Sequence, residues 1–202
     1  MKVELHLHTT RYSGCAAAAP QELMRRLIET GYEAVYITEH HSVWDDEELR
    51  RLQGQFPQIR IFPGVELTLE YRAFQHLLVL GTNDPAYLAI RDEADVLEKS
   101  RADGHLTVLA HPYRWGGADE MLKAGLLPDA LEYQTPNLEA WHAAQAMATA
   151  QQLDLPLVNS GDVHALDFID CFWIETSRSI ESARDIRAIV LARQYENCAA
   201  ER

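Results

Sequence analysis

Two short stretches of this sequence place metal-ligand side chains at every second position. His6 and His8 flank one apolar residue near the start of the chain, and Asp162 and His164 flank another near its other end. Alternate residues of a β-strand point to the same side, so each pair could reach one ion. Imidazole and carboxylate ligands together suit Zn, Mn, Fe or similar divalent ions. The two stretches therefore indicate a metal centre.

Further ligand-type side chains fall at the ends or starts of other expected strands. Each is a histidine or a glutamate: His40, Glu66, His76 and His111. In α/β barrels the strand ends form the mouth where catalytic side chains gather, so these residues are expected to converge. A lone histidine at a strand end is more often a hydrogen-bonded structural residue than a ligand. Several strand ends that each offer a histidine or a carboxylate indicate one shared site.

The elements that must position these side chains alternate along the chain. The expected strands are residues 3–7, 34–38, 60–65, 76–80, 107–110, 130–133, 157–160 and 170–175. The expected helices are residues 20–30, 45–55, 84–102, 118–124, 137–153 and 180–194. This alternation predicts an α/β fold with a parallel sheet or barrel. Residues 61–68 and 74–80 lack a helix between them, which predicts either a hairpin or an irregular excursion there.

Length and composition narrow the class of protein. A chain of 202 residues without a linker, repeat or low-complexity segment is expected to form a single domain over residues 1–202. The formal net charge of −13 argues against a general nucleic-acid-binding surface or attraction to anionic membranes. Three dispersed cysteines and the lack of a leader-like or ~20-residue apolar segment favour a cytoplasmic protein without a structural zinc knuckle. The sequence leaves the oligomeric state unknown.

Five segments carry a family resemblance. They are His6-Leu7-His8-Thr9-Thr10, Thr38-Glu39-His40, Pro63-Gly64-Val65-Glu66, Ala110-His111-Pro112-Tyr113-Arg114 and Gly161-Asp162-Val163-His164. In this order they resemble the motifs of the PHP family, the polymerase and histidinol phosphatase domain. The resemblance implies a distorted (β/α)7 barrel with two or three divalent metal ions, Zn, Mn or Fe, at its C-terminal rim. It implies metal ligands at His6, His8, His40, Glu66, His76, His111, Asp162 and His164.

The sequence departs from this family in two loops. Relatives often carry a further ligand shortly after the His-x-His pair, where this chain has Tyr12-Ser13-Gly14-Cys15. Either Cys15 or Ser13 could fill that position, or it is vacant. Relatives usually read Asp-His-Asp or Asp-His-Asn where this chain has Glu39-His40-His41. His41 is a substrate-orienting group, a proton donor or a solvated loop residue, and the last of these is favoured.

The resemblance implies that the protein hydrolyses a phosphate ester of a small phosphorylated substrate with a metal-activated water. Arg114 is expected to bind the phosphate bidentately, with Arg11 as a second candidate. Asp162 or His164 could protonate the leaving oxygen, although metal binding competes with that role. Glu132 is expected to hold a ligating imidazole in place. His105 and His142 are interpreted as structural.

Two other functions stay open at the level of sequence. A similar metal centre could hydrolyse C–N or C–O bonds, which would release no phosphate. The altered loops could instead belong to a non-catalytic regulatory domain that binds metal. The nearly complete set of ligand-type residues favours an enzyme. In a site that no longer catalyses a reaction, some ligand positions are expected to carry neutral residues that do not bind metal.

Overall fold

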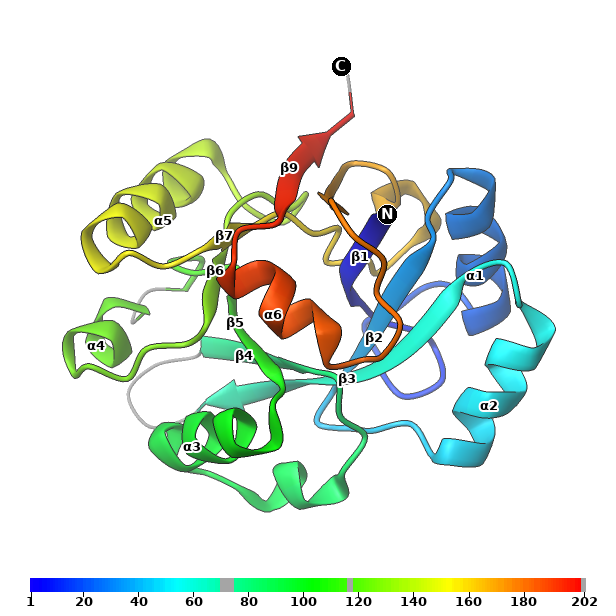
Figure 1. The fold of residues 1–202 in the computed structure, drawn as a ribbon, viewed down its shortest axis with the longest axis horizontal. Coiled ribbons are helices and arrows are strands. Elements are labelled where there is room, and N and C mark those ends of the chain that lie inside the picture. Colours follow the sequence, from blue (N-terminus) through cyan, green and yellow to red (C-terminus); the bar gives the residue numbers. More distant parts are fainter. Residues whose placement is uncertain (70–74, 116–117, 201–202) are drawn as a thin grey trace.

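The computed structural model describes residues 1–69, 75–115 and 118–200. One nine-stranded sheet, in the order β7-β6-β5-β4-β3-β2-β1-β8-β9, curls into a nearly closed barrel (Figure 1). The strands are β1 (Lys2–Leu7), β2 (Ala34–His40), β3 (Arg60–Leu69), β4 (Gln75–Leu80), β5 (Leu106–Ala110), β6 (Ala130–Glu132), β7 (Leu157–Val158), β8 (Phe172–Thr176) and β9 (Tyr195–Ala199). The α-helices are α1 (Pro20–Glu29), α2 (Asp46–Gln55), α3 (Glu93–Asp103), α4 (Ala118–Lys123), α5 (Ala140–Leu153) and α6 (Asp185–Leu191), with 3-10 helices η1 (Pro85–Ala89) and η2 (Leu166–Phe168). In these described ranges no helix is both long and apolar enough to cross a membrane.

The strands run in mixed directions. β1, β2 and β3 are parallel, as are β5, β6 and β7, whereas β4 is antiparallel to both of its neighbours. β3 pairs antiparallel with β4 from Gly64 opposite Leu80 to Leu69 opposite Gln75, which confirms the hairpin of the two alternatives. Residue 74, expected to open the second strand, lies outside the described residues. A parallel bridge between Leu7 and Val163 brings the segment after β7 back to β1. The expected α/β fold is confirmed, and it is distorted because β4, β8 and β9 interrupt the parallel order.

Two of the expected helices have clearly different bounds in the structure. The helix expected over residues 84–102 is divided into η1 and α3, because Asp84 caps the first and Asp92 caps the second. Each cap residue has extended backbone and accepts backbone N–H bonds through its carboxylate, so a new helix starts after Asp92. The last expected helix ends early at Leu191 and is followed by β9, whose polar sequence carries no clear strand alternation.

The barrel interior and the outer helix layer have separate apolar cores. Val3 and Leu5 of β1 belong to the interior cluster, which also holds Ile186 and Ile189 of α6. Leu7 belongs instead to the cluster that packs β1 and β2 against Leu23 and its neighbours in α1. Figure 1 shows α1 to α5 around the outside of the sheet and α6 across one end. The interior cluster joins α6 to the beginnings of β1, β2 and β5, so α6 covers the side of the barrel opposite the ends of these strands.

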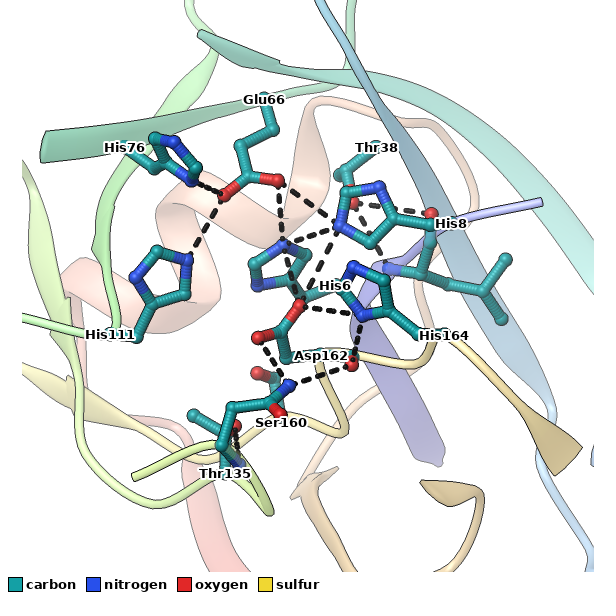
Figure 2. A network of polar contacts seen from close by, with 12 residues as sticks. His6, His8, Thr38, Glu66, His76, His111, Thr135, Ser160, Asp162 and His164 are labelled. Carbon is teal, nitrogen blue, oxygen red and sulfur yellow. Dashed lines mark hydrogen bonds and ion pairs between the residues drawn. The ribbon is translucent and has the colours of Figure 1, made fainter. Parts of the chain in front are cut away.

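A β-bulge in β1 explains how that strand changes faces. Glu4 pairs with Val35 and Leu7 pairs with Ile37, so three steps along β1 match two along β2. A bulge inserts one residue and re-aims the side chains that follow it. Val3 and Leu5 point into the barrel. After the bulge this alternation is reversed, so that Leu7 points outward and His6 points inward (Figure 2). The bulge therefore turns the His-x-His pair toward the interior.

Candidate metal centre

The predicted ligand residues converge on the carboxylate of Glu66, which β3 holds fully buried in the barrel (Figure 2). Glu66 Oε2 lies 3.2 Å from His6 Nε2, 3.1 Å from His8 Nε2 and 3.1 Å from His40 Nδ1. The second oxygen, Oε1, lies close to the two histidines from β4 and the loop after β5. It lies 2.6 Å from Nδ1 of the β4 histidine His76 and 3.1 Å from Nε2 of His111, which follows β5.

Asp162 and His164 complete the cluster from the segment after β7. Asp162 Oδ1 lies 3.3 Å from His6 Nε2, 3.6 Å from His8 Nε2 and 3.4 Å from His164 Nδ1. The sequence predicts that Asp162 and His164 share one face of a strand, but β7 ends at Val158 and Asp162 has φ +41°. The two residues meet the others because of a turn in the left-handed region, and only Val163 pairs with β1.

The spacing and the unpaired oxygens fit a divalent metal ion. Ligand atoms that each lie about 2.1 Å from one ion are separated by about 3.0–3.4 Å, which matches most of these distances. Glu66 Oε2 and Asp162 Oδ1 are buried and have no hydrogen-bond partner of acceptable geometry, although imidazole nitrogens surround both. Among residues 1–69, 75–115 and 118–200, three groups of potential ligands have mutually close donor atoms: His8–His40–His164, His6–His8–Glu66 and His40–Glu66–His76. The donors are nitrogen and oxygen, as expected for Zn, Mn or Fe.

The electrostatics of the cluster point the same way. Burial opposes ionisation of Glu66, but His6, His111 and His76 outweigh it and hold the pKa of that carboxyl well below its usual range. Burial also opposes protonation of His6, yet Asp162 and Glu66 raise its pKa well above the ordinary value. Without a cation, the charge of these buried carboxylates favours protonation of His6 and His8, whereas burial lowers the pKa of His40 to about 4 and also lowers that of His164. A divalent ion would replace those protons, because metal ligands bind in their deprotonated forms.

Glu132, at the end of β6, holds His6 as the sequence predicts. Its Oε1 lies 3.0 Å from His6 Nδ1, and the same oxygen accepts a hydrogen bond from Ser160 Oγ. The other oxygen accepts the backbone N–H of His111 at 2.5 Å. Glu132 therefore orients His6 with Nε2 toward Glu66. It also fixes the backbone of His111, a second candidate ligand.

Asn137 and Glu4 hold the Asp162 turn from two sides. Asn137 Nδ2 donates to Asp162 Oδ2 at 2.6 Å and to its backbone oxygen at 3.3 Å. Glu4 Oε1 accepts the N–H groups of His6 at 3.0 Å and Gly161 at 2.9 Å, so one buried carboxyl joins the β1 bulge to this turn. A Cβ on Gly161 would lie 2.7 Å from Glu4 Oε2, which leaves room for glycine alone.

Sequence reasoning missed Glu4 and Ser160. The available signal for Glu4 was a carboxylate inside an otherwise apolar strand, and for Ser160 a hydroxyl at the end of an expected strand. Both act through contacts with residues far away in the sequence. The pattern of the chain alone does not reveal such contacts.

Four of the seven non-glycine residues with positive φ in the described part of the chain lie at or within two residues of a candidate ligand. His41, His111, Tyr113 and Asp162 have φ values of +44°, +28°, +72° and +41°. Such conformations cost of order 1–3 kcal/mol for residues other than glycine and gather at functional sites. At His111 and Asp162 they set the direction of candidate ligands.

Arg114 lies beside the cluster, whereas Arg11 does not reach it. Arg114 Nη1 is 3.8 Å from Asp162 Oδ2, and its guanidinium lies 4.8 Å from the ring centroid of Trp115. Arg11 is half exposed and pairs with Glu48 of α2. Of the two arginines, the structure brings only Arg114 toward the candidate ligands.

The remaining candidates take other positions. Cys15 is an exposed free thiol, while the Ser13 side chain is buried and bonds to other protein groups. His41 accepts the backbone N–H of Thr68 at 2.9 Å through Nε2. His105 sits beside the start of β5, and His142 lies on α5, where its Nδ1 accepts the N–H of Glu139.

Comparison with known proteins gives a family match and several similar folds. The family model described as PHP domain matches residues 4–113, just over half of the chain. An uncharacterized protein of Methanocaldococcus jannaschii is 25% identical over 126 residues, which cover 56% of this chain and 68% of that protein.

Two solved structures share the fold at low sequence identity. A two-domain protein of Bacteroides vulgatus, described as containing a predicted PHP-like metal-dependent phosphoesterase, superposes with a TM-score of 0.74 and 16% identity over 98% of this chain. The present chain spans 64% of that protein's length. An amidohydrolase of Chromobacterium violaceum with bound sulfate and no metal gives a TM-score of 0.65 and 13% identity, covering 82% of this chain and 88% of that one.

Proposed function

The chain belongs to the PHP domain family, and on that basis we propose that it is a metal-dependent phosphoesterase acting on a small phosphorylated substrate. The observation that carries the proposal is the convergence of imidazoles on Glu66 and Asp162, each of which has one buried oxygen, Oε2 and Oδ1 respectively, without a hydrogen-bond partner. We further propose eight ligands for two or three ions of Zn, Mn or Fe: His6, His8, His40, Glu66, His76, His111, Asp162 and His164.

Bound divalent ions would lower the pKa of a bound water. Their positive charge would also stabilise the negative charge on the phosphate oxygens. The protein's own contribution begins with substrate binding. Arg114 approaches the cluster beside Asp162, and its planar guanidinium matches two phosphate oxygens. This arrangement supports Arg114 as the residue that anchors and orients the phosphate.

His164 and Asp162 have different proposed roles in proton transfer. Burial raises the pKa of Asp162, but His6 and His8 hold it far below its ordinary value, so this carboxyl carries no proton to donate. The His164 side chain is 22% exposed and can exchange protons with solvent. Burial and the neighbouring His8 lower the pKa of His164, so its imidazole would take a proton from solvent before donating it, and metal binding competes with this role. Of these two residues, His164 is still the better candidate to protonate the leaving oxygen, while Asp162 binds metal.

The similar fold of a named amidohydrolase supports hydrolysis of C–N or C–O bonds as a second candidate. The position of Arg114 favours the phosphoesterase, because a neutral amide or lactone gives a guanidinium no anionic partner. The two proposals differ in their products. Phosphate release and carboxylate or ammonia release can be measured on the same preparation.

The test uses protein that has been stripped with a chelator and reloaded with Mn or Zn. We expect phosphate release from some member of a panel of sugar phosphates, nucleoside monophosphates and phosphopeptides, and its loss in Asp162→Asn. The matched control is His142→Gln, which alters an imidazole on α5 and is expected to retain activity. Release of carboxylate or ammonia without phosphate would favour the second candidate, and activity unchanged in Asp162→Asn would contradict both.

A further inference from the structure

The hydroxyl of Ser13 lies between a buried carboxylate and the second imidazole of the His-x-His pair. Ser13 is 2% exposed, and Glu39 is fully buried. Ser13 Oγ donates a hydrogen bond to Glu39 Oε2 and lies 3.3 Å from His8 Nδ1. The same oxygen accepts the backbone N–H of His40 at 3.2 Å. Ser13 thus touches the backbone of one candidate ligand and the ring of another.

Glu39 accepts every hydrogen bond it makes in this network. Its Oε1 accepts from Thr9 Oγ1 at 2.5 Å and from Trp44 Nε1 at 3.1 Å. Its Oε2 accepts from Thr9 N at 3.1 Å in addition to the Ser13 hydroxyl. A carboxylate with four donors around it has no proton to return, so the Ser13 proton is committed to Glu39.

Because the Ser13 proton points to Glu39, only one direction is left for the hydrogen bond between Ser13 Oγ and His8 Nδ1. A serine hydroxyl has one proton and two acceptor sites. The proton of Ser13 goes to Glu39, and one acceptor site takes the His40 N–H. Toward His8 Nδ1, Ser13 can therefore only accept, and neutral His8 must carry its proton on Nδ1. Its Nε2 then has a free lone pair at 3.1 Å from Glu66 Oε2, inside the ligand cluster.

We propose that Ser13 and Glu39 are positioning residues that hold His8 in the Nδ1–H tautomer and present Nε2 to the metal. The first imidazole, His6, reaches Glu132 directly, whereas His8 reaches Glu39 through a serine. Ser13 is then a support for a ligand and not a ligand itself. The inference rests on the metal centre proposed above but does not depend on phosphate-ester hydrolysis.

The first test uses the wild-type protein loaded with zinc. Long-range proton–nitrogen NMR correlations of the imidazoles report which ring nitrogen binds zinc and which carries a proton. We expect His8 to bind through Nε2 and to keep a proton on Nδ1. Zinc binding through His8 Nδ1 overturns the inference but leaves the metal centre standing, whereas failure of the wild type to bind zinc overturns the proposed centre.

The second test measures zinc affinity by competition with a chelator. Ser13→Ala removes the acceptor for His8 and is expected to lower zinc affinity about 10–100-fold, the usual effect of losing a partner of a ligating histidine. Thr9→Val is the matched control, because it removes another hydroxyl bond to Glu39 without changing the contact to His8, and it should bind zinc much like wild type. Equal losses in the two variants, or wild-type affinity in Ser13→Ala, would overturn the inference. The NMR result on wild type decides the question if Ser13→Ala does not fold.

Discussion

The cluster of proposed metal ligands has a buried floor and a more open rim. We define the floor as His6, His8, Glu66, His111 and Asp162, whose side chains are at most 3% exposed. The rim comprises His40, His76 and His164, with exposed fractions of 30%, 13% and 22%. Both regions contribute to the three potential ligand groups. They differ in how much of each side chain water can reach.

The two regions also differ in their supporting contacts. On the floor, Glu132 holds His6, Ser13 contacts His8 and Asn137 donates to Asp162, so these ligands are oriented before any ion arrives. The rim imidazoles contact residues of the floor, as His76 Nδ1 contacts Glu66 Oε1. Oriented and buried ligands bind an ion tightly because little order is lost on binding. The comparison therefore predicts one firmly held ion and a more exchangeable ion or ions toward the rim.

Glu66→Gln should give the largest effect, because Glu66 is shared by floor and rim. Its two oxygens approach five imidazoles, and an amide would direct donor hydrogens at some of them. We expect less than one ion per chain and a fall of about 10³-fold or more in kcat/KM. Elemental analysis and a phosphate-release assay measure both. Retention of a full complement of ions would show that Glu66 is not the centre of the cluster.

His164→Ala should separate the regions, since it removes a rim ligand and leaves the floor unchanged. We expect one fewer ion per chain, with the firmly held ion retained, and an activity loss of about 10²-fold. The measurement is metal stoichiometry after dialysis against a weak chelator. Loss of every ion in this variant would mean that floor and rim bind metal as one unit, which would break the comparison.

Glu132→Gln tests the support of the floor without changing any proposed ligand. The amide cannot accept from His6, Ser160 and the His111 backbone in the way the carboxylate does. We expect the affinity of the firmly held ion to fall about 10–100-fold. Competition titration gives this value. An unchanged affinity would show that burial, and not orientation, distinguishes the floor.

The smallest expected effect comes from Glu4, which changes how the free energy of unfolding of the protein depends on pH. Burial, partly offset by hydrogen bonds from Gly161 and His6, raises its pKa from 4.5 to about 8. The folded state therefore keeps a proton that the unfolded chain loses above about pH 4.5. The contribution of Glu4 to the free energy of unfolding is full below that pH and is lost as pH rises toward 8, by up to about 1.4 kcal/mol per pH unit.

Urea unfolding of chelator-treated protein between pH 5 and 8 measures this slope. Glu4→Gln has no proton to lose, so its stability relative to wild type should rise with pH across this range. A difference between the two proteins that is independent of pH would contradict the expectation. The comparison with wild type removes the contributions of histidines that titrate in both.

Local patterns in the sequence predicted much of the fold. The alternation of strands and helices and the β3–β4 hairpin followed from apolar periodicity and turn residues, which depend on neighbours in the chain. The division of residues 84–102 and the strand β9 did not follow. Asp92 restarts a helix inside an apparently continuous pattern, and β9 is defined by its pairing with β8.

The sequence by itself determined which side chains are available for chemistry: histidines and carboxylates at strand ends, on a chain without clustered thiols. Only the tertiary structure decided how they are aimed. The bulge turns His6 inward, the turn at Asp162 replaces the expected strand, and Ser13 with Glu39 selects the nitrogen that His8 presents. The physical reason is that residue type and spacing are local properties, whereas strand register and hydrogen-bond direction depend on partners that only folding brings together.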